Sequence, residues 1–519
     1  MSQTDTLEGP DNAREQGLRA GRGGSMSIRR IGHAPETGRI RSPFARRRAG
    51  EPPTRTAVRN AKVAGLPLAF AGRQLAGAGR KALGQPATEV DRQIQIRTAQ
   101  HMFEVLAELK GCAAKLGQIM SLYELVLPPH LGEPYREALS RLYESAPIML
   151  PRTVHAAMAA NLGSEWRALF REFDDRHAAG ASIGQVHRAV WHDGRRVAVK
   201  LMYPGAREAV RADLQQLRRI SVLATAFVPS ADVAAVTAAI CASVEQELDY
   251  AAEARCQRRF ADAYAADPEF FVPQVITQCG DVVVSEWVDG IPMTRIIESG
   301  SPEERSRVGM LLLRFLLSTP SRTDLLYCDP HPGNFRILPD GRLAVLDFGA
   351  CDTWPAPGFP DAVAGLGEAI FNGGLGEVDA ALREHGFVAP GREFDVEAFA
   401  EAAVPICEAA RQQTFRFSTG WLREQALRAL SPTLSNVNRQ MTIPAHFTPY
   451  GRSALTAISV ICQLETEGAL RSELIRWSPE LAEVFDRFDR RSGNPADLAI
   501  VRQRRADAGE SAPRLRAVR

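Results

Sequence analysis

The sequence predicts an α+β fold in two lobes, with a small mixed sheet followed by a mostly helical half. Residues 181–203, "ASIGQVHRAVWHDGRRVAVKLMY", alternate in the manner of two strands joined by an Asp193-Gly194 turn. Residues 281–288, "DVVVSEWV", form a short apolar run that is typical of a buried strand. Residues 356–490 instead favour helices interrupted by Pro-Gly breaks.

Composition describes an ordinary globular protein. The chain has 519 residues, of which 45% are apolar and 24% charged, with a net charge of +2. This charge argues against a dedicated nucleic-acid binder, so no nucleic-acid partner is expected. The eight cysteines form no C-x-x-C pair, which favours reduced cysteines and indicates neither a disulfide framework nor a zinc site.

The N-terminal region is polar and basic. Residues 1–56 are rich in Gly, Ser, Pro and Arg, a composition typical of a disordered arm. Residues 57–89 mix apolar residues with spaced Lys and Arg, so this segment could lie on an anionic membrane surface or on the protein itself. Apolar runs fall short of the roughly 20 residues that span a bilayer. We therefore expect a cytoplasmic protein without a transmembrane span, with peripheral contact to the inner face of the membrane left open.

Periodicity predicts the remaining elements in order. Helical spacing over 90–160 precedes the sheet, and helical spacing returns over 206–266 and 303–320. The predicted domains are a helical extension over 90–163, a smaller lobe over 164–290, a helical lobe over 291–490, and a basic polar tail over 491–519.

One stretch, "LLYCDPHPGNFRILPDGRLAVLDFGA" (325–350), carries chemistry. Asp329 and Asn334 have the D-x-x-x-x-N spacing of a kinase catalytic loop, and Asp347 opens a D-F-G motif after a strand-turn-strand. Phosphoryl transfer needs metal ions on the phosphates and a carboxylate beside the attacking oxygen. The pattern predicts that Asp347 and Asn334 hold Mg²⁺ and that Asp329 orients the nucleophile.

A lysine and a glutamate complete the predicted site. "VAVK" ends at Lys200 and is typical of the strand whose lysine contacts the α- and β-phosphates of ATP. Glu253, on a helix about fifty residues later, is placed to pair with that lysine. The alternative is an ordinary strand end and a solvated helical charge.

Six motifs in order resemble the UbiB/AarF-type atypical kinases, a protein-kinase-like family associated with quinone and lipid metabolism. They are "KLGQ", "AAGASIGQVH", "VAVK", "ELDYAAEA", "DPHPGN" and "LDFG". The resemblance covers residues 90–350 by motif and 350–480 more loosely. It implies a two-lobed kinase-like fold with an N-terminal helical extension that carries the K-x-G-Q motif.

The resemblance also implies roles for individual residues. In this family the K-x-G-Q helix folds over the cleft, and its lysine meets the acids of an E-x-D motif. In this sequence the K-x-G-Q residues are Lys115 to Gln118, and the two acids are Glu247 and Asp249. It makes Glu253 the partner of Lys200. It implies ATP and Mg²⁺ as cofactors, with nucleotide contacts from Ala179, Gly180, Ala181, Ser182, Ile183, Val186, Lys200, Glu286 and Val288.

Three departures from the family pattern bear on function. Gly180 interrupts an alanine-rich loop, which puts the nucleotide preference in question because glycine allows closer approach of phosphate. Tyr327 stands where a histidine is common, which leaves the packing behind the catalytic loop open. Some bacterial relatives carry C-terminal membrane spans, whereas this sequence ends in "APRLRAVR".

The expected function is that of an ATP- and Mg²⁺-dependent atypical kinase or ATPase acting in, or regulating, isoprenoid-quinone or lipid metabolism. Its acceptor would be a lipid or quinone-precursor small molecule, because the K-x-G-Q helix occludes a peptide site. The alternatives are a nucleotide-binding pseudokinase scaffold, an ordinary Ser/Thr kinase, for which no A-P-E follows the D-F-G, and a choline-kinase-like phosphotransferase. The sequence leaves the acceptor and the oligomeric state open.

Overall fold

The computed structural model describes residues 148–225, 233–355, 359–429 and 447–491, with single positions or short runs between 72 and 97 and between 437 and 447. All of them belong to one compact unit, Pro52–Arg519; the other unit is Met1–Glu51. The predicted arm, the K-x-G-Q motif and the tail from 492 onward lie outside the described residues. Of the predicted membrane-contacting segment, residues 75–82 are helical.

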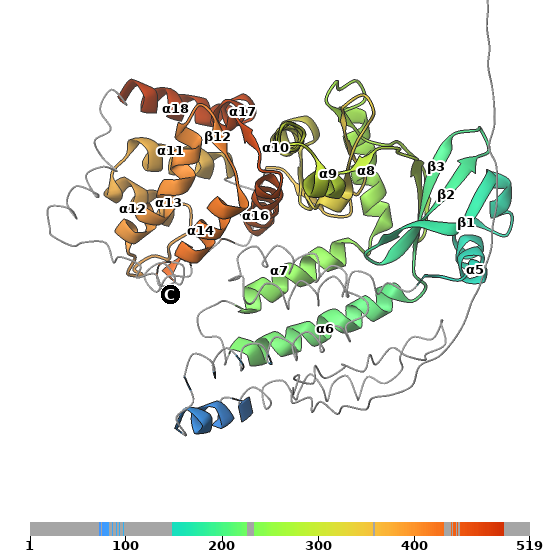
Figure 1. The fold of residues 1–519 in the computed structure, drawn as a ribbon, viewed down its shortest axis with the longest axis horizontal. Coiled ribbons are helices and arrows are strands. Elements are labelled where there is room, and N and C mark those ends of the chain that lie inside the picture. The colour runs from blue at the N-terminus through green and yellow to red at the C-terminus, as the bar shows by residue number, and fades with distance from the viewer. Residues whose placement is uncertain are drawn as a thin grey trace, which may run out of the picture. The chain divides into compact units, whose positions relative to one another are not determined.

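An antiparallel five-stranded sheet forms the first half (Figure 1), in the order β1-β2-β3-β6-β5. Its strands are β1 Phe170–Ala181, β2 Gly184–Trp191, β3 Arg196–Met202, β5 Val275–Cys279 and β6 Val282–Glu286. The predicted turn joins β2 to β3. Gly194 there has φ +98°, a left-handed conformation that glycine adopts without strain. Asp193 Oδ1 accepts from the Arg195 N–H at 2.9 Å and closes the turn.

The two faces of the sheet bury different partners because side chains alternate along a strand. Val197, Val199 and Leu201 of β3 pack in a cluster with Met158 of α5 (Pro151–Leu162) and with Trp166, at the start of the 3₁₀ helix Trp166–Leu169. Lys200, between two of these apolar residues, therefore projects from the opposite face. The alternation in "VAVKL" therefore places the lysine side chain on the face of the sheet that α8 covers.

Three helices form the predicted helical region over 206–266; α8 packs on that second face, and α6 and α7 pack against each other. They are α6 Ala206–Thr225, α7 Val233–Gln246 and α8 Tyr250–Ala263. Val210, Leu214, Val244, Tyr250 and Ala254 share one apolar cluster with Ile183 and Val283 of the sheet side. The last break has a local cause: the Asp249 side chain accepts from the Ala252 N–H at 2.8 Å and so caps the N-terminus of α8.

The second half is built around α10 (Pro302–Thr323), the long central helix predicted over 303–320. Ser301 caps its start, and the chain leaves it through Asp324, whose φ is +49°. Phe315 of α10 and Phe335 and Val345 of the neighbouring strands are fully buried in the largest apolar cluster. A four-stranded sheet in the order β4-β10-β9-β7 and a ribbon of β8 and β11 lie in this half. Their bounds, with two short helices, are β4 Phe270–Phe271, β7 Ile291–Pro292, α9 Met293–Ser299, β8 Leu325–Tyr327, the 3₁₀ helix Pro332–Asn334, β9 Phe335–Ile337, β10 Leu343–Val345 and β11 Cys351–Thr353.

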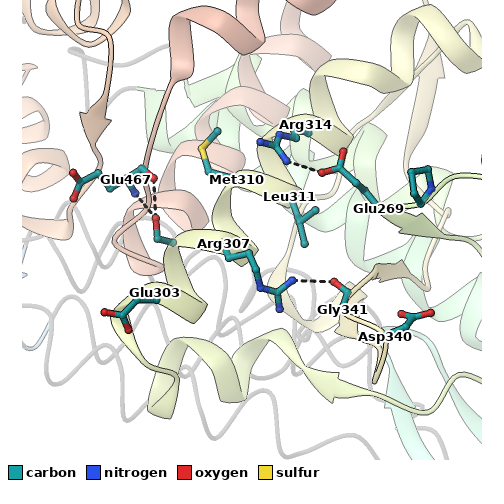
Figure 2. Close-up of a pocket in the computed structure, with 11 residues that line it drawn as sticks. Glu269, Glu303, Arg307, Met310, Leu311, Arg314, Asp340, Gly341 and Glu467 are labelled. Atoms are coloured by element: carbon teal, nitrogen blue, oxygen red, sulfur yellow. Dashed lines mark hydrogen bonds and ion pairs between the residues drawn. The ribbon is translucent and has the colours of Figure 1, made fainter.

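A cavity of about 600 Å³ opens beside α10 (Figure 2). Met310 and Leu311 form its apolar part, and an ion network lies on its wall. In that network Arg314 bridges two acids, with its Nη1 2.6 Å from Glu269 Oε1 and its Nε 2.7 Å from Glu473 Oε1. We refer to these three residues as the Arg314 network.

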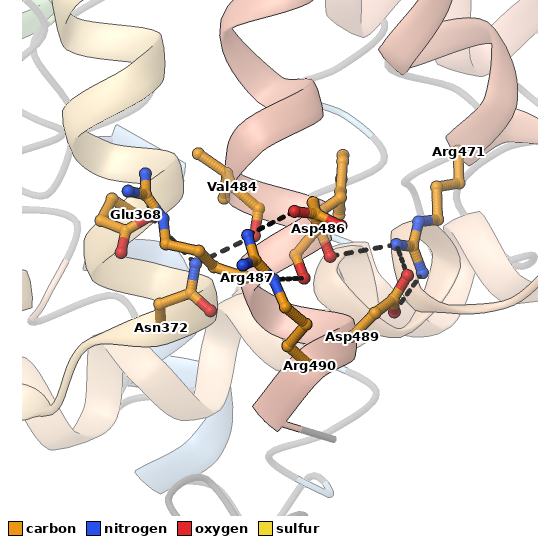
Figure 3. A network of polar contacts seen from close by, with 9 residues as sticks. Glu368, Asn372, Arg471, Val484, Asp486, Arg487, Asp489 and Arg490 are labelled. Carbon is orange, nitrogen blue, oxygen red and sulfur yellow. Dashed lines mark hydrogen bonds and ion pairs between the residues drawn. The ribbon is translucent and has the colours of Figure 1, made fainter. Parts of the chain in front are cut away.

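Helices complete the C-terminal half, as the breaks over 356–490 predict. They are α11 Phe359–Asn372, α12 Leu375–Glu384, α13 Val396–Arg411, α14 Thr419–Ala429, α16 Thr448–Gln463, α17 Leu470–Trp477 and α18 Pro479–Arg491, with a ribbon of β12 Phe415–Arg416 and β13 Glu467–Gly468. Helix α18 contacts α11 through two polar interactions (Figure 3). Asn372 Nδ2 donates to Val484 O at 3.0 Å, and Arg487 forms an ion pair with Glu368 at 3.0 Å. In the described part of the chain, no helix combines the length and apolarity needed to span a membrane.

Candidate active site

Lys200 lies between two carboxylates. Its Nζ is 2.6 Å from Glu253 Oε1 on α8 and 2.9 Å from Asp347 Oδ2 of the D-F-G motif. Tyr250 covers it from a third side, with the ammonium 5.1 Å from the ring centroid. The structure thus brings together a strand lysine, a helix glutamate and the D-F-G aspartate. We refer to Lys200, Glu253 and Asp347 as the Lys200 network.

Within the described part of the chain, the Lys200 network contains one cation and two carboxylates. Burial lowers the pKa of Lys200, but Asp347 and Glu253 together outweigh burial and hold that pKa well above its usual value. Burial raises the pKa of Glu253 to about 7, against the opposing pull of Lys200. The two directions are compatible because one ammonium is divided between two carboxylates, so each acid receives only part of its stabilisation. Glu253 Oε2 is buried and accepts no hydrogen bond from the described residues.

A third carboxylate approaches the same point. A Cβ placed on Gly349 would lie 3.2 Å from Asp347 Oδ1, 3.6 Å from Glu247 Cγ and 3.8 Å from Glu253 Oε2. Glu247, the first acid of the E-x-D motif, therefore lies beside the D-F-G turn. Asp249, the second acid, instead caps α8. Its predicted partner Lys115, like Gln118, lies outside the described residues, so that contact remains a prediction.

The catalytic-loop residues are held next to the D-F-G segment. Asn334 Nδ2 donates to the Asp329 carbonyl oxygen at 3.0 Å, which closes the D-x-x-x-x-N loop. The Leu346 N–H donates to Asn334 O at 2.9 Å, so Asn334 neighbours the residue before Asp347. Asp347 is itself oriented, because its Oδ1 accepts from the Gly349 N–H at 2.9 Å. The two predicted metal ligands thus come from adjacent backbone segments.

Tyr327, the departure from the family pattern, has a structural role that the sequence did not reveal. Its ring is fully buried, and its hydroxyl donates to the Asp347 carbonyl oxygen at 2.9 Å. Burial, with the neighbouring charges of Asp329 and Asp347, holds the pKa of this hydroxyl well above its usual value, so it remains a donor. Ser453 of α16 in turn donates to the Tyr327 carbonyl oxygen at 2.8 Å. The C-terminal helices thereby contact the back of the catalytic loop.

The predicted nucleotide loop is a tight hairpin. Ala179, Gly180 and Ala181 end β1 and pair with Val186, Gln185 and Gly184 of β2, which leaves Ser182 and Ile183 as the turn. The Ile183 side chain packs in the apolar cluster with Tyr250, and its predicted nucleotide contact stays a prediction. Val186 pairs with Lys200 across β2 and β3, which places the hairpin beside the lysine.

Gln185 and His187 form a buried polar chain that the sequence did not single out. Gln185 Nε2 lies 2.7 Å from His187 Nε2, and His187 Nδ1 lies 2.9 Å from Asp174 O. Burial lowers the pKa of His187, which favours its neutral form. The Met149 N–H donates to Gln185 Oε1 at 3.0 Å. This bond fixes the chain entering α5 to the nucleotide hairpin; the "GQVH" spacing alone gave no sign of it.

The predicted adenine segment follows β6. The Glu286 N–H donates to Gln274 O at 3.0 Å, and the Trp287 N–H donates to Arg196 O at 2.9 Å. These two N–H groups are therefore already paired within the protein, and the contact of Val288 with adenine stays a prediction.

The donor set fits Mg²⁺ bound together with nucleotide phosphates. Among the described residues, no three His, Cys, Asp or Glu side chains are grouped to hold a metal by themselves. Mg²⁺ needs no such cage, because it is commonly bound by one or two protein oxygens plus substrate phosphates. Asp347 and Asn334 carry oxygens of that kind, and the carboxyl side chains of Asp347, Glu247 and Glu253 lie around Gly349.

Comparison with known proteins identifies the family. The ABC1 atypical kinase-like domain matches residues 141–365. A Mycobacterium tuberculosis protein, solved as the complex of Rv3197 with erythromycin, is 37% identical, with a TM-score of 0.57; the match covers 76% of this chain and all of that one. The chain belongs to the UbiB/AarF family of atypical kinases. Its described residues therefore contain a kinase-like domain of mixed α and β structure.

Curated members of the UbiB/AarF family agree over a shorter span. The mitochondrial atypical kinase coq-8 of Caenorhabditis elegans is 30% identical over 302 residues, which is 56% of this chain and 39% of that protein. The mitochondrial atypical kinase COQ8 of Saccharomyces cerevisiae is 32% identical over 250 residues, 47% of this chain and 48% of that protein. The chain thus spans less than half the length of these relatives.

Proposed function

We propose that the protein binds Mg-ATP at the Lys200 network and acts as an atypical kinase or ATPase in isoprenoid-quinone or lipid metabolism. One observation carries the proposal: Lys200, Glu253 and Asp347 meet within hydrogen-bonding distance although they are far apart in sequence. A protein kinase needs this lysine–glutamate pair together with the D-F-G aspartate. The names of the relatives support the same class.

Each residue has a proposed task in nucleotide binding. Lys200 contacts the α- and β-phosphates, and Glu253 keeps its ammonium in place. The β1–β2 hairpin, residues 179–183, covers the phosphates, while Val288 supplies the backbone contact to adenine. A Cβ added to Gly180 would meet no described atom within 4 Å, so the hairpin leaves open space at this point for a phosphate oxygen.

Two residues would hold the metal, and one would act on the nucleophile. Asp347 and Asn334 bind Mg²⁺, which neutralises the charge that develops on the transferred phosphoryl group. Asp329, held in the loop that Asn334 closes, orients the attacking hydroxyl or water. The acceptor we propose is a lipid or quinone-precursor small molecule, presented at an anionic membrane surface.

ATP hydrolysis by the purified full chain tests the proposal. Turnover is measured with Mg²⁺, with and without anionic liposomes, in the wild type and in Asp347→Asn. We expect hydrolysis in the wild type that liposomes increase, and a loss of about 100-fold or more in the variant. Equal background rates in both proteins, with ATP still bound, would contradict turnover and favour the pseudokinase scaffold.

A second candidate function is the binding of a macrolide. It is favoured by the relative whose solved structure contains erythromycin, since that protein is 37% identical and matched along its whole length. Calorimetric titration of erythromycin into the full chain, with and without Mg-ATP, tests it. Heat of binding in both conditions would indicate a site separate from the nucleotide, and competition would place the macrolide in the same cleft.

A further inference from the structure

Two cysteines from distant parts of the sequence meet beside the candidate active site. Cys256 lies on α8, three residues after Glu253, and Cys351 opens β11, four residues after Asp347. Each thiol is the first cause of the pKa shift of the other, which lowers the pKa of Cys256 and raises that of Cys351. Both side chains pack against the same apolar cluster, next to the D-F-G segment.

The packing of α8 independently places Cys256 against this segment. Glu253 and Phe260 lie on one side of the helix, since seven residues make about two turns. Glu253 shares Lys200 with Asp347, and the Phe260 ring is 4.9 Å from the Phe348 ring. Cys256 lies between them on the same side. Cys351 reaches back toward the same residues, with its Sγ 3.6 Å from Phe348 O.

The pair differs from the other described cysteines. Cys241, Cys328, Cys407 and Cys462 are buried, and Cys279 is exposed, whereas Cys256 and Cys351 are partly accessible. The hydrogen bond from Cys351, followed by the nearby charges of Arg255 and Arg259, lowers the pKa of the Cys256 thiol. Partial access and a basic environment are the conditions that make a cysteine reactive.

We propose that Cys256 and Cys351 are a redox modification site, and that a hydroperoxide converts them into a reversible disulfide at the edge of the active site. A metal site is a weaker interpretation, because the described residues include no group of three potential ligands. The chemistry of the pair is therefore that of a dithiol.

The reaction proceeds in two balanced steps. The Cys256 thiolate attacks the peroxide oxygen and breaks the O–O bond, which gives a sulfenic acid on Cys256 and, after protonation, water from hydrogen peroxide or an alcohol from an organic peroxide. The Cys351 sulfur then attacks the Cys256 sulfur, the S–S bond forms, and the sulfenic oxygen leaves as water with the thiol proton. The peroxide is reduced by two electrons, and an external dithiol returns the pair to thiols.

The disulfide would act on the Lys200 network, a consequence that rests on the proposed function. An S–S bond is about 2.05 Å long, well below the contact distance of two thiols, so its formation draws α8 and β11 together. Glu253 moves with α8. Because displacements of about 1 Å can change rates by two orders of magnitude, we expect the oxidised protein to lose at least tenfold in ATP turnover.

Peptide mapping of the wild-type full chain tests the modification directly. The reduced protein is treated with hydrogen peroxide, blocked with N-ethylmaleimide and digested with trypsin, which cleaves at Arg336 and Arg342 and so separates Cys328 from Cys351. We expect a peptide that links Cys256 to Cys351 and disappears with dithiothreitol. Absence of this linkage under conditions that oxidise the exposed Cys279, or linkage of Cys256 to another cysteine, would overturn the proposal.

Two variants sharpen the result. In Cys351→Ser, Cys256 loses its resolving partner and should accumulate as a dimedone-reactive sulfenic acid. In Cys256→Ser, peroxide should leave ATP turnover unchanged. If the linkage forms but ATP turnover stays the same, the predicted effect on the site is wrong although the modification stands. If the reduced protein has no ATP turnover, the proposed function fails, and the mapping result is unaffected. If Cys351→Ser does not fold, the wild-type map alone decides.

Discussion

The Lys200 and Arg314 networks have the same plan, one cation between two carboxylates, yet among the described residues they differ in how many cations lie close to the two acids. Arg314 meets Glu473 and Glu269 through separate nitrogens, and Arg476 lies 4.0 Å from the second oxygen of Glu473. Two cations thus face two acids. Among the described residues around Lys200, one ammonium is shared by Glu253 and Asp347, and Glu247 approaches the same turn.

This difference separates a structural network from a ligand site. A balanced network needs nothing further, and its planar guanidinium fixes the geometry of both acids. Around Lys200, burial raises the pKa of Glu253 to about 7, which keeps this acid partly protonated near neutral pH. A strongly perturbed pKa is typical of functional sites, where a bound ligand supplies opposite charge. A metal-bound triphosphate would do so here, with Mg²⁺ on Asp347 and phosphate on Lys200.

The largest expected effect separates the two networks by activity. Asp347→Asn removes the charge that we propose to bind the metal and should lower Mg-dependent ATP hydrolysis by about 100-fold or more. Glu473→Gln, the matched change in the Arg314 network, should leave turnover within about twofold. Steady-state hydrolysis assays check both variants. A similar loss in each would show that the Arg314 network also serves turnover and would remove the distinction.

The second prediction separates the networks by stability. Lys200→Met leaves two acids without their cation and should lower the free energy of unfolding by about 3–5 kcal/mol at pH 8. Arg314→Met should cost less, about 1–2 kcal/mol, because Glu269 is one-third exposed and Arg476 still faces Glu473. Urea denaturation of both variants checks the order. A larger cost for Arg314→Met would mean that charge balance is not what distinguishes the networks.

A third prediction concerns pH. The pKa of Glu253 is raised to about 7 from the ordinary 4.5, so the folded protein holds this proton more tightly than the unfolded chain does. The contribution is fully present below pH 4.5 and is lost as pH rises through about 7, with a size of about 3 kcal/mol. Glu253→Gln should therefore flatten this part of the stability profile between pH 5 and pH 7.5.

Unfolding free energies of the wild type and of Glu253→Gln, measured at steps across that range, check the sign. A wild-type profile that rises as steeply as that of the variant would show that Glu253 is ionised throughout.

The smallest expected effects come from two glycines of the nucleotide hairpin. A Cβ on Gly184 would lie 2.3 Å from Leu201 O and 3.0 Å from the hydroxyl of Tyr250, the ring that covers Lys200. Gly184→Ala should destabilise the protein by about 1–3 kcal/mol through this overpacking. A Cβ on Gly180 meets no described atom within 4 Å, so Gly180→Ala should change stability by less than about 0.5 kcal/mol.

Thermal unfolding of the two variants gives the stability comparison, and nucleotide titration of Gly180→Ala tests whether its effect is on ATP affinity instead. Equal destabilisation by both substitutions would mean that the hairpin is packed more tightly at Gly180 than the described contacts allow.

Local sequence patterns predicted much of the fold and many residues of the candidate site. Alternation around Val199 predicted β3, the Asp193-Gly194 pair predicted its turn, and motif spacing selected Lys200, Glu253, Asn334 and Asp347. These features depend on residues close in sequence or on motifs whose partners the family pattern already relates. The structure adds how they meet, through the shared ammonium of Lys200.

What the sequence could not indicate depends on contacts between distant segments. Nothing near Gln185 predicts its bond to Met149, and nothing near Tyr327 predicts its bond to the Asp347 carbonyl oxygen. Cys256 and Cys351 showed no regular spacing because their proximity arises from helix packing. Asp249 is predicted to meet a lysine that lies outside the described residues, and the structure adds a second role, the cap of α8. Short polar side chains serve both purposes equally well.

Side chains alternate between the two faces of β3, so the face on which Lys200 lies depends on whether an odd or an even number of residues precedes it in the strand. Deleting one residue between Arg196 and Val199 would turn the ammonium toward Met158 and α5 and expose a valine or leucine to the acids of α8. Deleting two residues would return the lysine to its original side. Natural or engineered changes in this strand should therefore be tolerated in even steps, whereas the turn at Gly194 can absorb either kind.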